Sequence, residues 1–188
     1  MYRPFFKPLI DKTIAFFLLL ITLPITGIIT LLLYFYNHGK PFFFQSRPGL
    51  KGKIFRIVKF KTMHDNYDAK GSLLPDTERL TAIGAFVRKT SLDELPQLIN
   101  VLQGDMSLVG PRPLPVRDFH EFNEDWHRRR FSVRPGITCL WQVNGRSGIP
   151  FEKWMELDLE YIDQWSLLLD LKILFKTIPA VIKGSGAA

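Results

Sequence analysis

Residues 90–113 read TSLDELPQLINVLQGDMSLVGPRP, and the rest of the chain is organised around this segment. Two adjacent carboxylates, Asp93 and Glu94, precede apolar residues at helical spacing, and Gly104 marks the end of the pattern. A helix is therefore predicted whose first turn carries both acids. A loop then delivers Arg112 between two prolines, which stiffen its backbone. Acids, free N–H donors at a helix start and an arginine together suit chemistry on a phosphate.

A purely structural interpretation of the same segment is equally favoured by the spacing alone. Ser91 and Glu94 have the spacing of a capping box, which satisfies free N–H groups without any catalysis. Asp93 in a first turn would also suit the helix dipole. The stiff presentation of Arg112 shifts the balance towards anion binding, because solubility does not need it.

The N-terminal part contains the most hydrophobic segment. Residues 14–36 carry no charge, and this segment is long enough to span a bilayer. Basic residues flank both ends, so the positive-inside rule gives no orientation. Pro24 lies near the middle, where it bends a helix, and each half covers only about half of a roughly 30 Å hydrocarbon core. The residues leave two alternatives open: a spanning helix, or a re-entrant helix that bends at Pro24 and leaves on the same face.

The charge distribution points to a membrane surface. The net charge is +7, and residues 1–58 carry all of that excess while the rest of the chain is neutral. A basic flank around an apolar segment fits anionic membrane lipids, whereas a nucleic-acid partner would favour basic residues along the folded domain. Cys139 is the only cysteine, which excludes an intrachain disulfide and indicates a reducing compartment.

The segments on either side of residues 90–113 have readable patterns. Residues 41–60 predict a β-hairpin whose second strand carries Lys59, with Lys61 on the same side. Residues 64–78 are polar and predict a loop, and residues 80–90 predict a short helix that carries Arg88 towards the two acids.

The second half of the chain is expected to be mainly helical. The basic run 128–130 is interpreted as a solvated helix end, and residues 134–146 as loop and turn with one short strand, presenting Arg134 and Arg146. Helices are predicted at 151–164 and 167–183. The second is strongly apolar, and because the chain is already tethered to a membrane, an amphipathic helix in the interface is favoured over a core helix.

Several long motifs together resemble the bacterial sugar transferases, and more closely the monotopic polyprenyl-phosphate phosphoglycosyl transferases in their minimal catalytic form. These motifs are KFKTM (59–63), SLDELPQLINVLQGDMSLVGPRP (91–113), RPGITCLWQVNGR (134–146) and the ending 158–187. The resemblance implies transfer of sugar-1-phosphate from a UDP-sugar to a polyprenyl phosphate such as undecaprenyl phosphate, with release of UMP. It also implies a re-entrant N-terminal helix, although many relatives have Ser-Pro at the bend where this chain has Leu23 and Pro24.

The resemblance assigns roles to residues that the chemistry had already picked out. Asp93 would be the nucleophile that forms a covalent phosphosugar intermediate, and Glu94 would assist it. Mg²⁺ is the expected cofactor, with Asp93 as its ligand. Arg112 would be a bidentate phosphate clamp. Weaker candidates for substrate binding are Lys59, Arg88 and Arg146.

We therefore expect an α+β, mainly helical monotopic membrane protein of the bacterial inner membrane. Residues 1–40 would form the membrane helix and its flanks, and residues 41–188 a catalytic domain on the cytoplasmic face. The reaction would begin the synthesis of an O-antigen, capsule, exopolysaccharide or glycoprotein glycan. A prenyl-diphosphate phosphatase and a non-catalytic basic membrane adaptor are the alternatives. The sequence does not identify the sugar, and exposed aromatic helices are compatible with a homodimer.

Overall fold

The computed structural model describes residues 2–116, 125–145 and 148–183, and it is mainly helical with two small sheets. The predicted α+β, mainly helical class is therefore confirmed. The principal elements are α1 (Lys7–Tyr36), β1 (Phe42–Pro48), β2 (Ile54–Phe60), α2 (Asp76–Arg79), α3 (Ala82–Lys89), α4 (Gln97–Gln103), β3 (Ser107–Val109), α6 (Asp125–Arg128), β4 (Gly136–Thr138), α7 (Leu140–Asn144), α8 (Phe151–Gln164) and α9 (Leu167–Lys183). The short turns η2 (Leu50–Gly52), η3 (Leu92–Glu94) and η4 (Arg129–Ser132) connect them.

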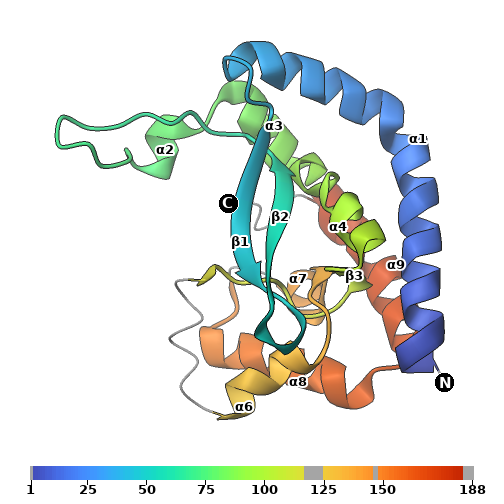
Figure 1. The fold of residues 1–188 in the computed structure, drawn as a ribbon. Helices are drawn as coiled ribbons and strands as arrows, with labels where there is room; N and C mark the ends of the chain where they lie inside the picture. Colours follow the sequence, from blue (N-terminus) through green and yellow to red (C-terminus); the bar gives the residue numbers. More distant parts are fainter. Residues whose placement is uncertain (1, 117–124, 146–147, 184–188) are drawn as a thin grey trace.

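Helix α1 is long, apolar and bent. It contains Pro24, which cannot donate a backbone hydrogen bond to the preceding turn. In Figure 1 the first half of α1 runs along one edge of the molecule, and the second half turns over the hairpin. Only 11% of its most apolar window is buried inside the protein. A helix this apolar and this exposed is expected to contact lipid rather than water.

The predicted hairpin is confirmed and carries the first basic residues of the site. Strands β1 and β2 are antiparallel, with Phe42 opposite Phe60 and Phe43 opposite Lys59. The rings of Phe42 and Phe60 stack at 5.4 Å between centroids. Beyond the end of β2, the amide of Asn37 donates to the carbonyl oxygen of Lys61 at 2.7 Å. This contact ties the C-terminal end of α1 to the end of the hairpin.

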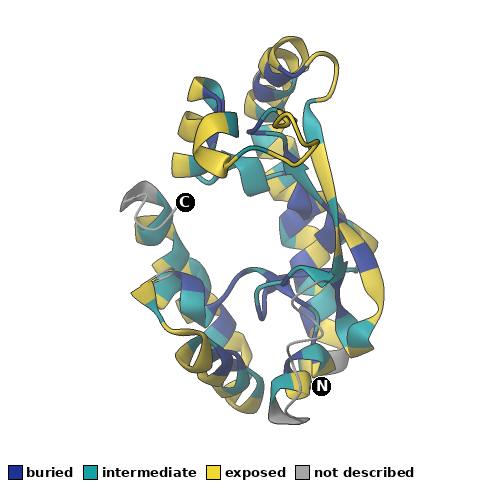
Figure 2. Cartoon of the chain, turned by 90° about the vertical axis from the view of Figure 1, so that its left-hand side faces the viewer, coloured by how far each residue is buried: buried dark blue, intermediate teal, exposed yellow. Residues whose placement is uncertain are grey.

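The main core lies between α1, α4, α9 and the two small sheets. Its most buried members include Ile57, Val101, Met106 and Ile173. Figure 2 shows buried positions on the inner sides of the elements and exposed positions along their outer sides. The core therefore fixes β2 and α4, which flank the two acids at residues 93 and 94.

Strand β3 pairs in parallel with β4, and no strand was predicted at residues 107–109. The pairing brings Gly110 and Gly136 into backbone contact: a Cβ on Gly136 would lie 2.1 Å from the backbone nitrogen of Gly110. Only glycine fits such a close approach. The sheet joins residues 105–113, which carry Arg112, to the segment around residue 136.

The capping box predicted at Ser91 is wrong. Ser91 has a left-handed backbone (φ 56°) and its side chain caps no helix. Asp93 and Glu94 lie on the short turn η3, and α4 begins only at Gln97. Pro96 occupies the N-cap, because proline has no N–H to leave unsatisfied at a helix start. The acids are therefore placed by a strained turn ahead of the helix and not by its first turn.

The two C-terminal helices are confirmed, and α9 is amphipathic. Ile173 is fully buried, whereas Leu168 and Phe175 are 78% and 70% exposed. The exposed apolar side of α9 is compatible with the predicted interfacial placement. The basic run 128–130 was predicted to be a solvated helix end. This is wrong for Arg130, which is only 4% exposed.

A group of mostly buried polar residues joins the turn before α1, α1 itself, β3, α8 and α9, and we call it the anchor cluster. It consists of Tyr2, Lys7, Asp11, Ser107, Tyr161 and Asp170. The Nζ atom of Lys7 lies 2.8 Å from Asp11 Oδ1 and 3.1 Å from Asp170 Oδ2. Tyr161 donates to Asp170 Oδ1 at 2.8 Å, and Ser107 donates to the other oxygen of Asp11. The start of α1 is thus fastened to β3, α8 and α9.

Candidate active site

A cavity of about 490 Å³ opens beside the hairpin and collects nearly all the predicted site residues. Lys59, Arg88, Asp93, Glu94 and Arg112 all line it. Arg146, the remaining binding candidate, lies outside the described residues. The cavity is bounded by β2, α3, the turn η3 and the loop after β3, so segments far apart in the chain converge on the two acids.

Four of these side chains form a charged network that we call the catalytic cluster: Lys59, Asp93, Glu94 and Arg112. The Nζ atom of Lys59 lies 2.6 Å from Glu94 Oε1, and Arg112 Nη2 lies 3.0 Å from the same oxygen. The contact from Lys59 to Asp93 Oδ2 is longer, at 3.8 Å. Both acids line the cavity, but Glu94 is bound closely by two cations, whereas the one ion pair of Asp93 is the longer contact to Lys59.

The electrostatics of the two acids diverge for the same reason. Burial raises the pKa of Asp93 to about 6, and the nearby Lys59 only partly opposes this effect. Burial would also raise the pKa of Glu94, but Arg112 and then Lys59 outweigh it and hold that pKa far below its usual range. Two adjacent carboxylates with separated pKa values are typical of functional sites. Asp93 is the carboxylate whose charge is less fully compensated.

Arg112 is held from two directions. Its guanidinium lies 5.7 Å from the centre of the Trp141 ring, and Trp141 stacks on Trp154 at 4.5 Å. Its carbonyl oxygen accepts a hydrogen bond from Arg130 Nη2 at 2.7 Å. Arg112 is consequently presented on a fixed backbone, as its two flanking prolines suggested. Its role as a bidentate phosphate clamp stays a prediction.

Arg88 and Arg134, also named from the sequence, lie in two different cavities. Arg88 lines the cavity and donates from Nε to Thr62 Oγ1 at 2.8 Å, which leaves its guanidinium at the cavity wall. Arg134 donates from Nε to the carbonyl oxygen of Gly104 at 2.8 Å and lines a separate cavity of about 200 Å³. Arg88 is thus part of the site, whereas Arg134 supports the end of α4.

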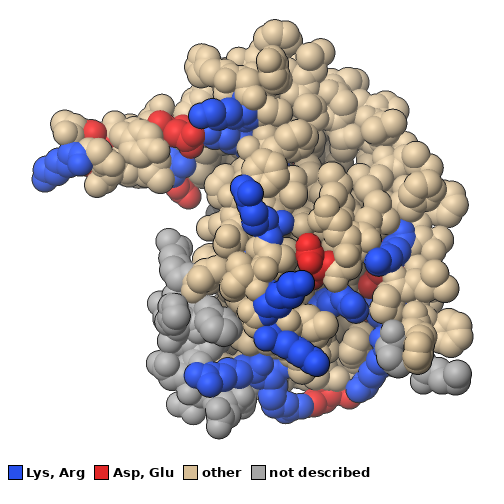
Figure 3. All heavy atoms as spheres, viewed as in Figure 1, with Lys and Arg blue, Asp and Glu red and all other residues tan. Residues whose placement is uncertain are grey.

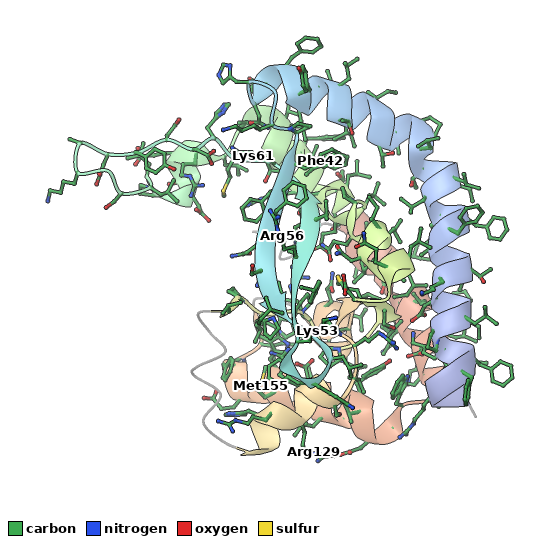
Figure 4. The ribbon with its side chains drawn as sticks, in the orientation of Figure 1. Phe42, Lys53, Arg56, Lys61, Arg129 and Met155 are labelled. Carbon is green, nitrogen blue, oxygen red and sulfur yellow. The ribbon has the colours of Figure 1, made fainter. Side chains whose placement is uncertain are left out.

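The structure adds cavity residues that the sequence reasoning did not select. The added polar and aromatic lining residues are Phe43, Gln45, Arg47, Phe60, Lys61, Thr62, Asp65, Asp76, Arg79, Trp141 and Gln142. Lys61 was noted on the same side of the strand as Lys59, and this spacing is the signal that could have identified it. Figure 4 shows Lys61 where the chain leaves the hairpin.

Residues 64–80 form an arm that extends away from the body of the molecule (Figure 1). The arm is a loop, as predicted, with a bridge between Tyr67 and Leu73 and the short helix α2. Leu73 and Asp76 line the cavity, so the arm contributes one of its walls. Figure 3 shows basic side chains gathered on the lower half of this face, around a few acidic ones. Anionic substrates would be attracted to such a surface.

The residues present fit a magnesium ion bound in one particular way. Within residues 2–116, 125–145 and 148–183, no three His, Cys, Asp or Glu side chains form a ready-made metal cage. Mg²⁺ commonly binds through one or two carboxylates together with substrate phosphates and water. Asp93 suits that mode, because it is a less fully compensated carboxylate that lines a cavity large enough for phosphates.

Comparison with known proteins identifies the relatives of this chain. The sequence model of the family described as "Bacterial sugar transferase" matches residues 2–184. The "Uncharacterized sugar transferase EpsL" of Bacillus subtilis is 51% identical over 181 residues, which cover 96% of this chain and 89% of that protein.

Two longer relatives carry names that state a reaction. The "UDP-glucose:undecaprenyl-phosphate glucose-1-phosphate transferase" of Escherichia coli is 39% identical over 177 residues, which cover 89% of this chain and 38% of that protein. The "Undecaprenyl-phosphate galactose phosphotransferase" of Salmonella typhimurium is 39% identical over 166 residues, which cover 79% of this chain and 35% of that protein. This chain therefore spans little more than a third of the length of either one.

Proposed function

The chain belongs to the bacterial sugar transferase family as a polyprenyl-phosphate phosphoglycosyl transferase, and from this premise we propose how it works. The donor is a UDP-sugar, and the acceptor is undecaprenyl phosphate or a related polyprenyl phosphate. The products are a polyprenyl-diphosphate sugar and UMP, in the first membrane step of a bacterial polysaccharide or other glycoconjugate. The names of the relatives support this donor and acceptor, and they differ in the sugar, so the sugar stays open.

Asp93 is the nucleophile of the first step. Its carboxylate oxygen forms a bond to the phosphorus that bears the sugar, and the bridging P–O bond to UMP breaks, with its electron pair leaving on UMP. The product is an acyl phosphate that carries the sugar on Asp93. In the second step a phosphate oxygen of the polyprenyl phosphate attacks that phosphorus, and Asp93 leaves as a carboxylate. No redox change or external reactant is required.

The observation that carries the proposal is the unequal treatment of the two acids. Glu94 is neutralised by Lys59 and Arg112, which suits a residue that orients those cations. Asp93 is partly buried, lines the cavity and has only a longer ion pair to Lys59, which suits a nucleophile. With substrate bound, Lys59 and Arg112 would also lie beside the phosphates and offset their charge. Mg²⁺ held by Asp93 and the substrate phosphates would supply Lewis-acid activation.

We further propose that residues 1–40 enter the membrane as a re-entrant helix and that residues 41–188 lie at the cytoplasmic face. The bend of α1, its exposed apolar surface and the basic residues at both ends support this placement. Cysteines introduced one at a time at residues 3 and 40 test it in inverted membrane vesicles, with the native chain as the control for the buried Cys139. Both sites should be labelled from the cytoplasmic side. Labelling from opposite sides would show a spanning helix.

The covalent mechanism is tested by intact-protein mass spectrometry of detergent-held protein with Mg²⁺, a panel of UDP-sugars and no lipid acceptor. We expect a mass increase of one sugar phosphate in the native chain, accompanied by UMP, and none in Asp93→Asn. UMP release only when polyprenyl phosphate is present, without any adduct, would indicate direct transfer. Free phosphate released from a polyprenyl diphosphate, with water as acceptor, would indicate a phosphatase. Binding to anionic vesicles without any turnover would indicate an adaptor.

A further inference from the structure

A buried ion pair lies behind the site and belongs neither to the cavity lining nor to the anchor cluster. Arg130 of η4 and Asp158 of α8 are joined by a contact of 2.7 Å from Nη2 to Oδ2, and their side chains are 3% and 1% exposed. The sequence reasoning had interpreted Arg130 as part of a solvated basic run. A pair this inaccessible cannot contact substrate, so any role in the reaction must act through other residues.

Arg130 contacts the main chain of Arg112. Its Nη2 atom donates to the carbonyl oxygen of Arg112 at 2.7 Å while the same guanidinium is paired with Asp158. A charged donor makes a stronger hydrogen bond than a neutral one, and a planar guanidinium held by a carboxylate has a fixed direction. The position of the Arg112 backbone is therefore set by a group that is itself held in place.

The same guanidinium also reaches the side chain of Arg112 through a pair of aromatic rings. Arg130 lies 5.9 Å from the centre of the Trp154 ring, and Trp154 stacks on Trp141 at 4.5 Å. Trp141 in turn lies beneath the guanidinium of Arg112 at 5.7 Å. Main chain and side chain of Arg112 are thus supported from a single buried residue.

Stability alone is a weak reason to bury such a pair. Removing two charges from water is costly, and apolar residues of similar volume often replace a buried ion pair without loss of stability. What an apolar pair could not supply is the hydrogen bond to the Arg112 carbonyl. We propose that Arg130, oriented by Asp158, is a positioning residue that fixes Arg112 against Glu94 and against the donor diphosphate. This inference rests on the proposed function, since it assigns Arg112 a part in the reaction.

The central test replaces the pair by apolar residues of similar size, in Arg130→Met/Asp158→Leu. We expect the rate of phosphosugar formation at saturating UDP-sugar to fall about 10- to 100-fold, the range in which supporting residues usually act. We expect thermal unfolding to stay within a few degrees of the native chain. An unchanged rate in this variant would overturn the proposal.

A matched control comes from the same two elements. Arg129 of η4 pairs with Asp163 of α8 on the surface, where the side chains are 52% and 57% exposed. Figure 4 shows Arg129 at the lower edge of the molecule, away from the hairpin end that carries Lys61. Arg129→Met/Asp163→Leu removes one ion pair between η4 and α8 by the same substitutions, and it should retain the native rate. A similar loss in both variants would mean that tethering η4 to α8 is what matters.

A double-mutant comparison separates positioning from general structure. In an Arg112→Lys background, the apolar replacement of Arg130 and Asp158 should change the rate less than about twofold, because the residue being positioned is already altered. A further 10- to 100-fold loss there would show that the pair acts independently of Arg112 and would refute the proposal. Arg130→Lys, which keeps the charge opposite Asp158 but loses the planar fork, provides a second variant if the apolar pair does not fold. We expect an intermediate rate for it, and a native rate would overturn the proposal.

Failure of this inference can be told apart from failure of the proposed function. If the native chain forms no phosphosugar adduct with any donor, the function itself is wrong. If the native chain forms the adduct and Arg130→Met/Asp158→Leu forms it equally fast, only the positioning role is wrong.

Discussion

The anchor cluster and the catalytic cluster are both built from lysine and carboxylate groups, buried in the first and partly buried in the second, yet they are organised in opposite ways. In the anchor cluster Asp11 and Asp170 share Lys7, and both also accept hydrogen bonds from hydroxyl groups. In the catalytic cluster the two cations converge on Glu94, and Asp93 is left with a contact of 3.8 Å. One cluster gives each of its carboxylates close partners, and the other leaves one of them with a single longer ion pair, as the proposed nucleophile requires.

The difference distinguishes a structural use of buried charge from a chemical one. Close partners stabilise the charged form of a carboxylate and occupy its oxygens. Such a carboxylate is a poor nucleophile towards an incoming phosphorus. Asp93 has a cavity on one side and too little positive charge on the other, so substrate and metal can complete its environment. If this contrast is right, substitutions in the two clusters should differ in kind, and the largest effect is expected at Asp93.

Asp93→Asn should lower phosphotransferase activity by at least about 10⁴-fold, or roughly 5.5 kcal/mol in the reaction barrier, because an amide cannot form the acyl phosphate. UMP release in the presence of polyprenyl phosphate measures the effect. The exposed carboxylate of Asp163 gives a control, and Asp163→Asn should be fully active. Retention of more than a hundredth of the activity in Asp93→Asn would remove the chemical distinction between the two clusters.

Lys7→Met should destabilise the protein by roughly 3–5 kcal/mol, since it leaves two buried carboxylates without their shared cation. Urea unfolding in detergent measures the loss. The fraction that remains folded should still form the phosphosugar adduct at the native rate. A folded variant that forms no adduct would show that the anchor cluster has a chemical role after all.

Asp93→Asn should also stabilise the metal-free protein, in a pH-dependent manner. Because the pKa of Asp93 rises from 3.8 to about 6 on folding, the folded state binds more protons than the unfolded state between those values. The native chain therefore loses stability as the pH rises through this window, whereas the amide does not titrate. The free energy of unfolding of Asp93→Asn should equal that of the native chain near pH 4 and exceed it by up to about 3 kcal/mol above pH 7.

Unfolding at pH 4, 6 and 8 in the presence of a chelator measures this advantage. An advantage that shrinks with increasing pH would mean that Asp93 is well compensated in the folded protein. The two clusters would then not differ in the way described.

Tyr161→Phe should have the smallest effect, a loss of roughly 1.5 kcal/mol in unfolding free energy. The hydroxyl donates to Asp170 Oδ1 at 2.8 Å and lies 3.0 Å from the carbonyl oxygen of Val109, while the ring remains to fill the core. Thermal unfolding measures the loss, and activity should not change. A loss below about 0.3 kcal/mol would indicate that Lys7 and Tyr2 satisfy Asp170 without the Tyr161 hydroxyl.

The parts of the fold that depend on local sequence could be predicted. Helices α8 and α9 begin and end where their apolar periodicity begins and ends, and the hairpin follows from two aromatic runs around a glycine-containing turn. Strand β3 could not be predicted, because three buried residues show no alternation and need β4 as a partner. The turn at Ser91 was misread because a capping box and a left-handed turn use the same residue type.

The same division holds within the site. Asp93, Glu94 and Arg112 were found because their motif lies within a single stretch of sequence. Trp141 was missed because its ring becomes part of the site only when α7 packs beside the loop that carries Arg112. Arg130 was misinterpreted because it ends a run of three arginines, of which the first two are exposed, and its partner Asp158 is on another helix. Long-range ion pairs of this kind leave no local pattern.

The anchor cluster also has a consequence for how the protein is made. The hydrogen bond from Tyr2 to Asp170 joins residues 168 positions apart, so one partner leaves the ribosome long before the other. At typical rates of synthesis the interval is on the order of ten to thirty seconds. During that time α1 can enter the bilayer before Asp170 is available to pair with Lys7. With α1 in the bilayer, as proposed above, the emergence of α9 then completes the cluster at the membrane.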